Sequence, residues 1–191
     1  FAIIGTGQSV KELTEKFNGD VYVVAVNSAV RFLDRYDCFF SLDPSKLNIE
    51  NYHIAEDHGS NAYLAVDPSN PLYSNPNYRT IIRKSNKNSF LRNPMTAEEW
   101  FNRWGCLYGF SDDADSVNTG NSMFGALNFV YHMNPGKVAL FGLDGSTEAS
   151  VGSNHKPNNL SHLGILFSSC VDQLNRKGIK VVNGSTKSII S

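Results

Sequence analysis

Cysteine and long apolar runs are scarce in this sequence of 191 residues, and each shortage argues against a class of protein. The three cysteines, Cys38, Cys106 and Cys170, lie far apart and form neither a CxxC pair nor a metal-binding spacing. This pattern favours a reducing compartment, with each cysteine a small core residue. No apolar run reaches the roughly 18 residues of a membrane span, and no signal peptide is recognisable. The expected protein is cytoplasmic and has no membrane span.

An excess of positive charge is also missing. Lys and Arg total 17 against 18 Asp and Glu, a net charge of −1, whereas nucleic-acid binders are usually basic. Only residues 79–92 (RTIIRKSNKNSFLR) depart from this balance, with five cations and no acid. Nucleic acid or another anionic partner would therefore bind only through this stretch. A solvated surface strand is the more ordinary interpretation of residues 79–92. The sequence leaves homo-oligomerisation open.

The sequence does contain an alternation of short apolar runs and helical patterns. Strands are predicted at 1–5, 21–27, 38–43, 137–144 and 179–183, and helices at 6–17, 28–36, 96–104, 119–133 and 160–177. Ser9 with Glu12, and Thr96 with Glu99, have the spacing of capping boxes. The alternation predicts a single α/β domain over residues 1–191, Rossmann-like, with a mainly parallel sheet and helices on both faces.

Two segments interrupt this regular pattern. Residues 44–117 hold five of the seven prolines and are predicted to be an irregular insertion with short strands at 61–66 and 78–83. Residues 145–159 are rich in Gly, Ser and Asn and are predicted to be a loop that could act as a lid.

Small and hydrogen-bonding residues stand where the predicted strands end, which is where open α/β sheets bind ligands. These candidate ligand-binding residues are Gly5, Thr6, Gly7, Gln8, Ser9, Asn27, Asp43, Thr119, Gly120, Asn121, Ser122 and Gly142. Glycines let a backbone approach an anion, and free N–H groups at a helix start can hold it. The loops 5–9 and 119–122 therefore predict a cleft for a nucleotide-type ligand, although residues 119–122 are equally typical of an ordinary helix cap.

Two common nucleotide motifs are absent. Val10 replaces the third glycine of GxGxxG, and Asn27 stands where an acidic residue would bind an NAD ribose. No Lys-Ser or Lys-Thr follows the first glycines, so there is no Walker A motif. Dehydrogenases and P-loop NTPases are disfavoured.

Histidine and aspartate supply the candidate catalytic groups. His155, in the loop after Asp144, is the preferred general base because imidazole titrates near neutral pH, and His162 is the next choice. Asp43 and Asp144 could hold a divalent cation such as Mg²⁺ beside phosphates, but capping roles fit them equally well. No cofactor and no metal ligand is assigned.

The pieces GTGQS, VVAVN, NTGNSMFGALNF and VALFGLD resemble bacterial sialyltransferases that use CMP-sialic acid, and the related hydroxymethylpterin diphosphokinase-like and phage proteins. The resemblance covers residues 1–43 and 117–191. It implies that Gly5, Thr6, Gly7 and Asn27, with Thr119, Gly120 and Ser122, contact the nucleotide. It also implies that a histidine in the lid is the base, and His155 is the nearest match to it. The family's lid tyrosines have no counterpart between Asp144 and the last helix.

Three functional hypotheses follow. The first is a nucleotide-sugar-dependent glycosyltransferase, sialyltransferase-like, in which His155 deprotonates an acceptor hydroxyl and Asp144 serves the same site. The second is ATP- and Mg²⁺-dependent phosphoryl or diphosphoryl transfer, with Asp43 and Asp144 at the metal. The third is a non-catalytic nucleotide-binding protein.

Overall fold

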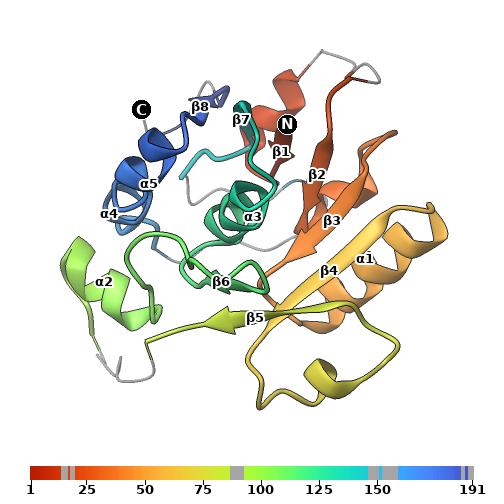
Figure 1. The fold of residues 1–191 in the computed structure, drawn as a ribbon, viewed down its shortest axis with the longest axis horizontal. Helices are drawn as coiled ribbons and strands as arrows, with labels where there is room; N and C mark the ends of the chain where they lie inside the picture. The colour runs from red at the N-terminus through yellow and green to blue at the C-terminus, as the bar shows by residue number, and fades with distance from the viewer. Residues whose placement is uncertain are drawn as a thin grey trace.

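Eight parallel strands form one sheet in the computed structural model, which describes residues 1–13, 17, 20–86, 93–145, 151, 159–185 and 188 (Figure 1). The strands are β1 Ala2–Ile4, β2 Val23–Val26, β3 Cys38–Ser41, β4 Asn61–Val66, β5 Thr80–Lys84, β6 Ser116–Asn118, β7 Lys137–Phe141 and β8 Lys180–Asn183. Their order is β6-β5-β4-β3-β2-β1-β7-β8, and every pair is parallel. The predicted parallel α/β fold of Rossmann-like type is confirmed.

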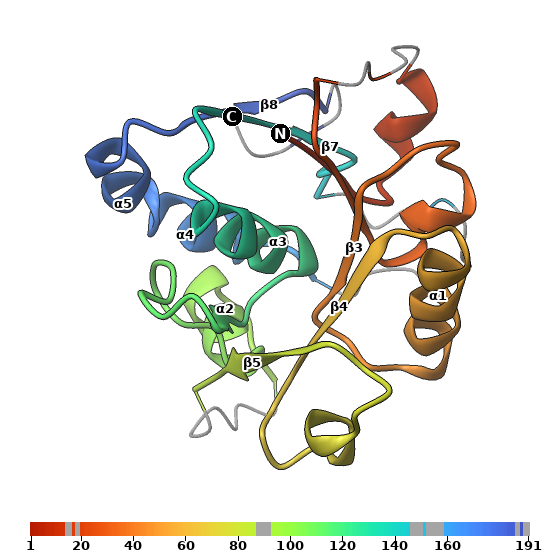
Figure 2. The ribbon, with the colours of Figure 1, turned by 45° about the vertical axis from the view of Figure 1, so that its right-hand side comes forward.

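Helices cover both faces of the sheet, as the buried character of the strands predicts. The α-helices are α1 Lys46–Asp57, α2 Ala97–Arg103, α3 Ser122–Tyr131, α4 Leu163–Ser168 and α5 Val171–Arg176; the 3₁₀ helices are η1 Gln8–Glu12, η2 Asn27–Arg31 and η3 Pro71–Ser74. Figure 2 shows β3 and β4 between α3 on one side and α1 on the other. Alternate residues of each strand serve the two faces, because successive side chains point in opposite directions. In β1, Ile3 packs with the α3 side, whereas Ala2 and Ile4 pack with the α1 side.

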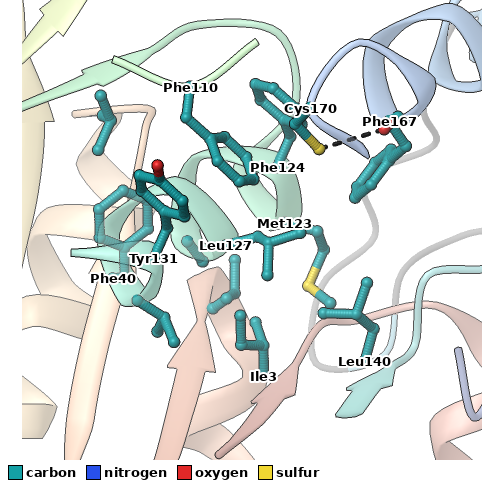
Figure 3. Close-up of a cluster of buried hydrophobic side chains, with 14 of the residues drawn as sticks. Ile3, Phe40, Phe110, Met123, Phe124, Leu127, Tyr131, Leu140, Phe167 and Cys170 are labelled. Carbon is teal, nitrogen blue, oxygen red and sulfur yellow. Dashed lines mark hydrogen bonds between the residues drawn. The ribbon is translucent and has the colours of Figure 1, made fainter. Parts of the chain in front are cut away.

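The core on the α3 side is the larger of the two. Figure 3 shows Met123 and Leu127 of α3 directed towards Ile3 of β1 and Leu140 of β7, and all four are buried. Burying one such apolar side chain contributes about 1.5–3 kcal/mol. The cysteines belong to this core as predicted: each is buried, and burial raises the pKa of each thiol to about 12.

Residues 44–117 are more regular than their sequence indicates. The segment contributes α1, α2 and strands β4, β5 and β6, so it builds the three strands at one end of the sheet. Helix α1 escaped prediction because its buried positions include Asn48 and Asn51 alongside Tyr52 and Ala55. Their spacing is helical, but amide side chains in half of the buried positions hide the apolar stripe on which a prediction relies.

None of the helices within the described ranges combines the length and apolar content that crossing a bilayer requires.

Candidate functional site

A cleft of about 1110 Å³ runs along the carboxyl edge of the sheet. Residues that follow each of the strands β1 to β7 line it, together with the region where α4 begins. The lining includes Gly5, Thr6, Gly7, Asn27, Asp43, Asp67, Ser85, Thr119, Gly120, Asn121, Ser122, Gly142, Asp144 and His162. The predicted strand-end residues therefore gather on one edge, except that Gln8 and Ser9 lie outside the lining. His155 lies outside the described residues.

The strand order reverses at one end of this cleft. From β1 the chain builds the sheet outward through β2 to β6, and then returns to place β7 on the other side of β1. The loops after β1 and β7 consequently diverge from the same point, which is where open α/β sheets bind their ligands. We call this place, formed by residues 5–9 and 142–145, the switch-point junction.

Glycine allows the two loops of the switch-point junction to touch. The Gly5 N–H donates to the Phe141 carbonyl at 2.7 Å, and the Gly7 N–H donates to the Gly142 carbonyl at 3.0 Å. A Cβ atom on Gly7 would lie 2.6 Å from the Gly142 oxygen and 2.6 Å from Cγ of Asp144. Gly142 itself has a φ of 71°, which favours glycine. Close packing of backbone on backbone thus explains these glycines without a ligand.

Asp144 is a buried member of the junction rather than a solvent-exposed carboxylate. One of its oxygens accepts the Ser9 backbone N–H at 2.7 Å, and the other accepts a short hydrogen bond from the Ser9 hydroxyl. Ser9 therefore does not cap a helix over residues 6–17: it lies inside the short η1 helix and bonds to β7's loop instead. The backbone N–H groups of Gly7 and Ser9 are already used within the protein, which leaves fewer amides for an anion than the sequence suggests.

The arrangement of carboxylates gives little support to a metal centre. Both Asp144 oxygens accept hydrogen bonds from Ser9, and Asp43 is exposed at the end of β3. Among the described residues, no group of three or more His, Cys, Asp or Glu side chains is arranged to hold a metal ion. The residues described here therefore do not form the ligand set that Mg²⁺-dependent phosphoryl transfer would use.

Asn27 holds a left-handed conformation, with a φ of 54°, at the end of β2. Its side chain connects two other parts of the cleft: the Ser41 hydroxyl donates to its carbonyl oxygen at 2.8 Å, and its amide donates to the Ser122 hydroxyl at 3.2 Å. Non-glycine residues in this conformation are uncommon and gather at functional sites. The second N–H and the second oxygen lone pair of this amide suit the edge of a nucleobase or a ribose.

The loop between β6 and α3 forms the floor of the cleft. The Asn121 side chain accepts the Met123 N–H at 2.8 Å, so Asn121 is the N-cap of α3, and Thr119 lies before the helix. Asn128, fully buried in α3, fixes the approach to this loop by accepting the Ser111 N–H at 3.0 Å and the Asn118 N–H at 2.9 Å. Asn128 lies within the piece NTGNSMFGALNF, but nothing in the sequence pointed to this role.

His162 is the histidine that the structure places in the cleft. It is 2% exposed, lines the cleft, and lies 3.4 Å from the Gly120 carbonyl through Nε2. A carbonyl only accepts, so Nε2 carries the proton, and the buried Nδ1 keeps a lone pair with no partner in the described part of the chain. Burial lowers the pKa of His162, with the Gly120 carbonyl opposing this effect. The neutral ring, with its tautomer set by Gly120, has the form that a general base requires.

The free energy of unfolding is expected to fall as the pH is lowered through about 6.5. Burial lowers the pKa values of both His132 and His162 in the folded protein. Below the unfolded-state pKa of about 6.5, the unfolded chain takes up protons that the folded chain does not bind. Stability is complete above that pH and is lost as the pH falls towards the folded pKa values, by at most about 1.4 kcal/mol per pH unit for each histidine.

Urea unfolding at pH 7.5, 6.5 and 5.5 measures this loss. His162→Asn should flatten the dependence. An equal slope in wild-type protein and in the His162 variant would contradict the assignment.

The basic stretch 79–92 does not form one surface among its described members. Arg79 donates to Asn61, Lys84 lies 3.5 Å from Asp113, and Arg83 lines the cleft. Residues 87–92 lie outside the described part.

Comparison with protein-family models, with curated proteins and with solved structures finds no match to this chain. Its own topology therefore defines the class: an α/β protein with an eight-stranded, all-parallel sheet of Rossmann-like type and a polar cleft at the switch point of that sheet.

Proposed function

We propose that this protein is a nucleotide-dependent glycosyltransferase, related in its site to the sialyltransferase-like enzymes that its motifs resemble. The observation that supports this most strongly is the meeting of Gly5–Gly7, Asn27 and residues 119–122, far apart in sequence, on one cleft at the switch point. The nucleotide of a sugar donor would lie at this end. Asn27 and Ser122 would hydrogen-bond its base or ribose, and the phosphate would approach the α3 N-terminus.

The transfer step needs a base and a leaving group. A neutral histidine takes the proton of an acceptor hydroxyl while that oxygen attacks the anomeric carbon of the donor sugar. The bond from this carbon to the phosphate oxygen breaks, and the nucleotide leaves with the electron pair. Among the described residues, His162 lines the cleft and has an unpaired but buried Nδ1, so this role requires the acceptor to gain access to that atom; His155 is the other candidate.

Nucleotide binding is expected to depend on the Asn27 side chain. Isothermal titration with CMP, UDP, GDP and ADP should detect one favoured nucleotide, and Asn27→Gly should weaken its binding by about 10- to 100-fold, the loss of one or two hydrogen bonds. Glycine keeps the left-handed backbone, so the change removes only the side chain.

Asn134 offers a matched control for this experiment. It also has a left-handed φ, 53°, but lies before β7 at the opposite end of that strand and does not line the cleft. Asn134→Gly should leave the affinity unchanged. Binding of none of the four nucleotides by wild-type protein would end the proposal.

Turnover separates an enzyme from a binding protein. With the sugar donor of the favoured nucleotide, replacing the catalytic histidine by asparagine should lower kcat by about 10²- to 10⁴-fold with little change in nucleotide affinity. His162→Asn and His155→Asn are measured in parallel. If neither variant loses turnover, neither histidine is the base. If the wild type has no turnover, the cleft binds a nucleotide without catalysis.

A further inference from the structure

We propose that the cleft has a second subsite, formed by Arg83, Arg103 and Trp104, which binds the acceptor through a phosphate or carboxylate group. This inference rests on the proposed function, because it names the class of the second substrate. All three residues line the cleft, at the end that lies along β5 and α2. We call them the basic end.

Arg83 is a half-buried cation with no carboxylate partner among the described residues. Its Nη1 donates to the Leu42 carbonyl at 2.7 Å, which fixes the guanidinium against the end of β3. The ion pairs in the described part of the chain involve Arg31, Arg35, His53 and Lys84, and neither Arg83 nor Arg103 is among them. A partly desolvated guanidinium that lines a cleft and has N–H donors beyond the one given to Leu42 is suited to an anion supplied by a ligand.

Arg103 and Trp104 add a second cation and a flat apolar surface. Arg103 is the last residue of α2 and is exposed, and Trp104 follows it with 43% of its surface exposed. The Trp104 ring stacks on Trp100, with centroids 6.1 Å apart, which holds it in place at the rim. Guanidinium groups bind phosphate and carboxylate bidentately, and an indole face suits the apolar side of a sugar or another ring. The three residues together match an anionic acceptor that carries a ring.

The basic end and the switch-point junction are too far apart to share one chemical group. β5 is four positions from β1 in the sheet, a distance of about 19 Å at about 4.8 Å per strand. The β6–α3 loop extends over three of these four positions, from β5 to β2: the Thr119 N–H donates to Lys84 of β5 at 2.8 Å, and Ser122 meets Asn27 of β2. At about 1110 Å³ the cleft also exceeds the roughly 300–1,000 Å³ of single-ligand pockets. It has room for a donor and an acceptor.

Inorganic phosphate and acetate are the probes that test this subsite. Each is titrated into the nitrogen-15-labelled protein, and the backbone amide signals of Ser85, Asn86 and Gly105, which line the basic end, report binding there. We expect these signals to shift saturably with at least one of the anions. The double variant Arg83→Gln/Arg103→Gln should bind that anion at least about tenfold more weakly, since both charge-assisted contacts are lost.

Lys84→Gln is the matched control. It removes the same charge from the next residue of β5, but Lys84 contacts Asp113 and does not line the cleft. Its affinity for the anion should equal that of the wild type. The single variant Arg103→Gln, at an exposed position, keeps the test decisive if the double variant does not fold.

The outcomes separate this inference from the proposed function. Absence of saturable shifts at the basic end, or shifts that the arginine substitutions leave unaltered, would overturn the subsite even if nucleotides bind at the junction. If nucleotide affinity falls in the double variant Arg83→Gln/Arg103→Gln, the arginines belong to the donor site, and the acceptor subsite is overturned as well. Anion binding at the basic end without nucleotide binding would instead overturn the proposed function.

Discussion

Gly7→Ala is expected to destabilise the protein by about 3 kcal/mol, at the upper end of the losses seen when atoms are forced into a packed interior. The added Cβ would lie 2.6 Å from the Gly142 carbonyl oxygen and 2.6 Å from Cγ of Asp144. Gly7 has a φ of −64°, which alanine adopts readily, so the loss is steric rather than conformational. Relief requires the loops after β1 and β7 to separate, which also breaks the Gly7–Gly142 hydrogen bond.

Urea unfolding measures this loss, and Gly136→Ala is its control. No atom lies within 4 Å of a Cβ placed on Gly136, so that variant should unfold close to the wild type. A Gly7 variant as stable as the Gly136 variant would mean that the two loops part easily. The switch-point junction would then not be the rigid base that the cleft needs.

Asp144→Ala is expected to cost about 2–4 kcal/mol, because it leaves the N–H and the hydroxyl of Ser9 without their acceptors. Asp144 and Ser9 are 3% and 6% exposed, so water does not readily replace the lost bonds. Ser9→Ala removes one bond only and should cost about 1 kcal/mol. The double variant should lose less than the sum of the two single losses, since the pair acts as a unit.

Asp43→Ala provides the comparison within the same cleft. Asp43 is exposed, and its substitution should leave the denaturation midpoint nearly unchanged. If the Asp144 variant were as stable as the Asp43 variant while losing affinity for Mg²⁺, Asp144 would be a metal ligand and the structural role given to it here would be wrong.

Local chemistry explains which elements were predicted well. The Thr96–Glu99 capping box is confirmed: the Glu99 N–H donates to the Thr96 hydroxyl at 3.2 Å, and the Thr96 N–H donates to the Glu99 carboxylate at 3.1 Å. Hydrogen bonds from the backbone N–H groups of Met95 and Thr96 to its carboxylate lower the pKa of Glu99. All partners lie within four residues, so the sequence contains the whole interaction.

The same Ser-x-x-Glu pattern fails at Ser9 because a distant partner competes. Asp144 lies 135 residues away and takes both donors of Ser9, so a 3₁₀ turn forms over Gln8–Glu12 in place of the predicted capped helix. No residue near Ser9 in the sequence indicates that Asp144 will bind it. Helix α1 shows the reverse case, since buried amides such as Asn51, which accepts from Arg31 at 2.6 Å, concealed a helix that tertiary contacts stabilise.

The residues of the candidate site also fall into those that the sequence identified and those that only tertiary contacts revealed. Asn27, Thr119–Ser122 and Gly142 were identified from the sequence because strand ends of a parallel sheet share one edge, whichever order the strands take. His162 was placed second to His155, because neither its burial nor its contact with Gly120 can be inferred from neighbouring residues.

By itself, the sequence determined seven of the eight strands, most of the α-helices and the polar residues at the carboxyl ends of the strands, because apolar periodicity and capping act over a few residues. Only the tertiary structure decided that β7 returns beside β1 and that Asp144 faces Ser9. It also decided that Arg83 points into the cleft, whereas Lys84 meets Asp113. These contacts join residues tens to more than a hundred positions apart. Their free energy depends on how whole layers pack, which no local pattern contains.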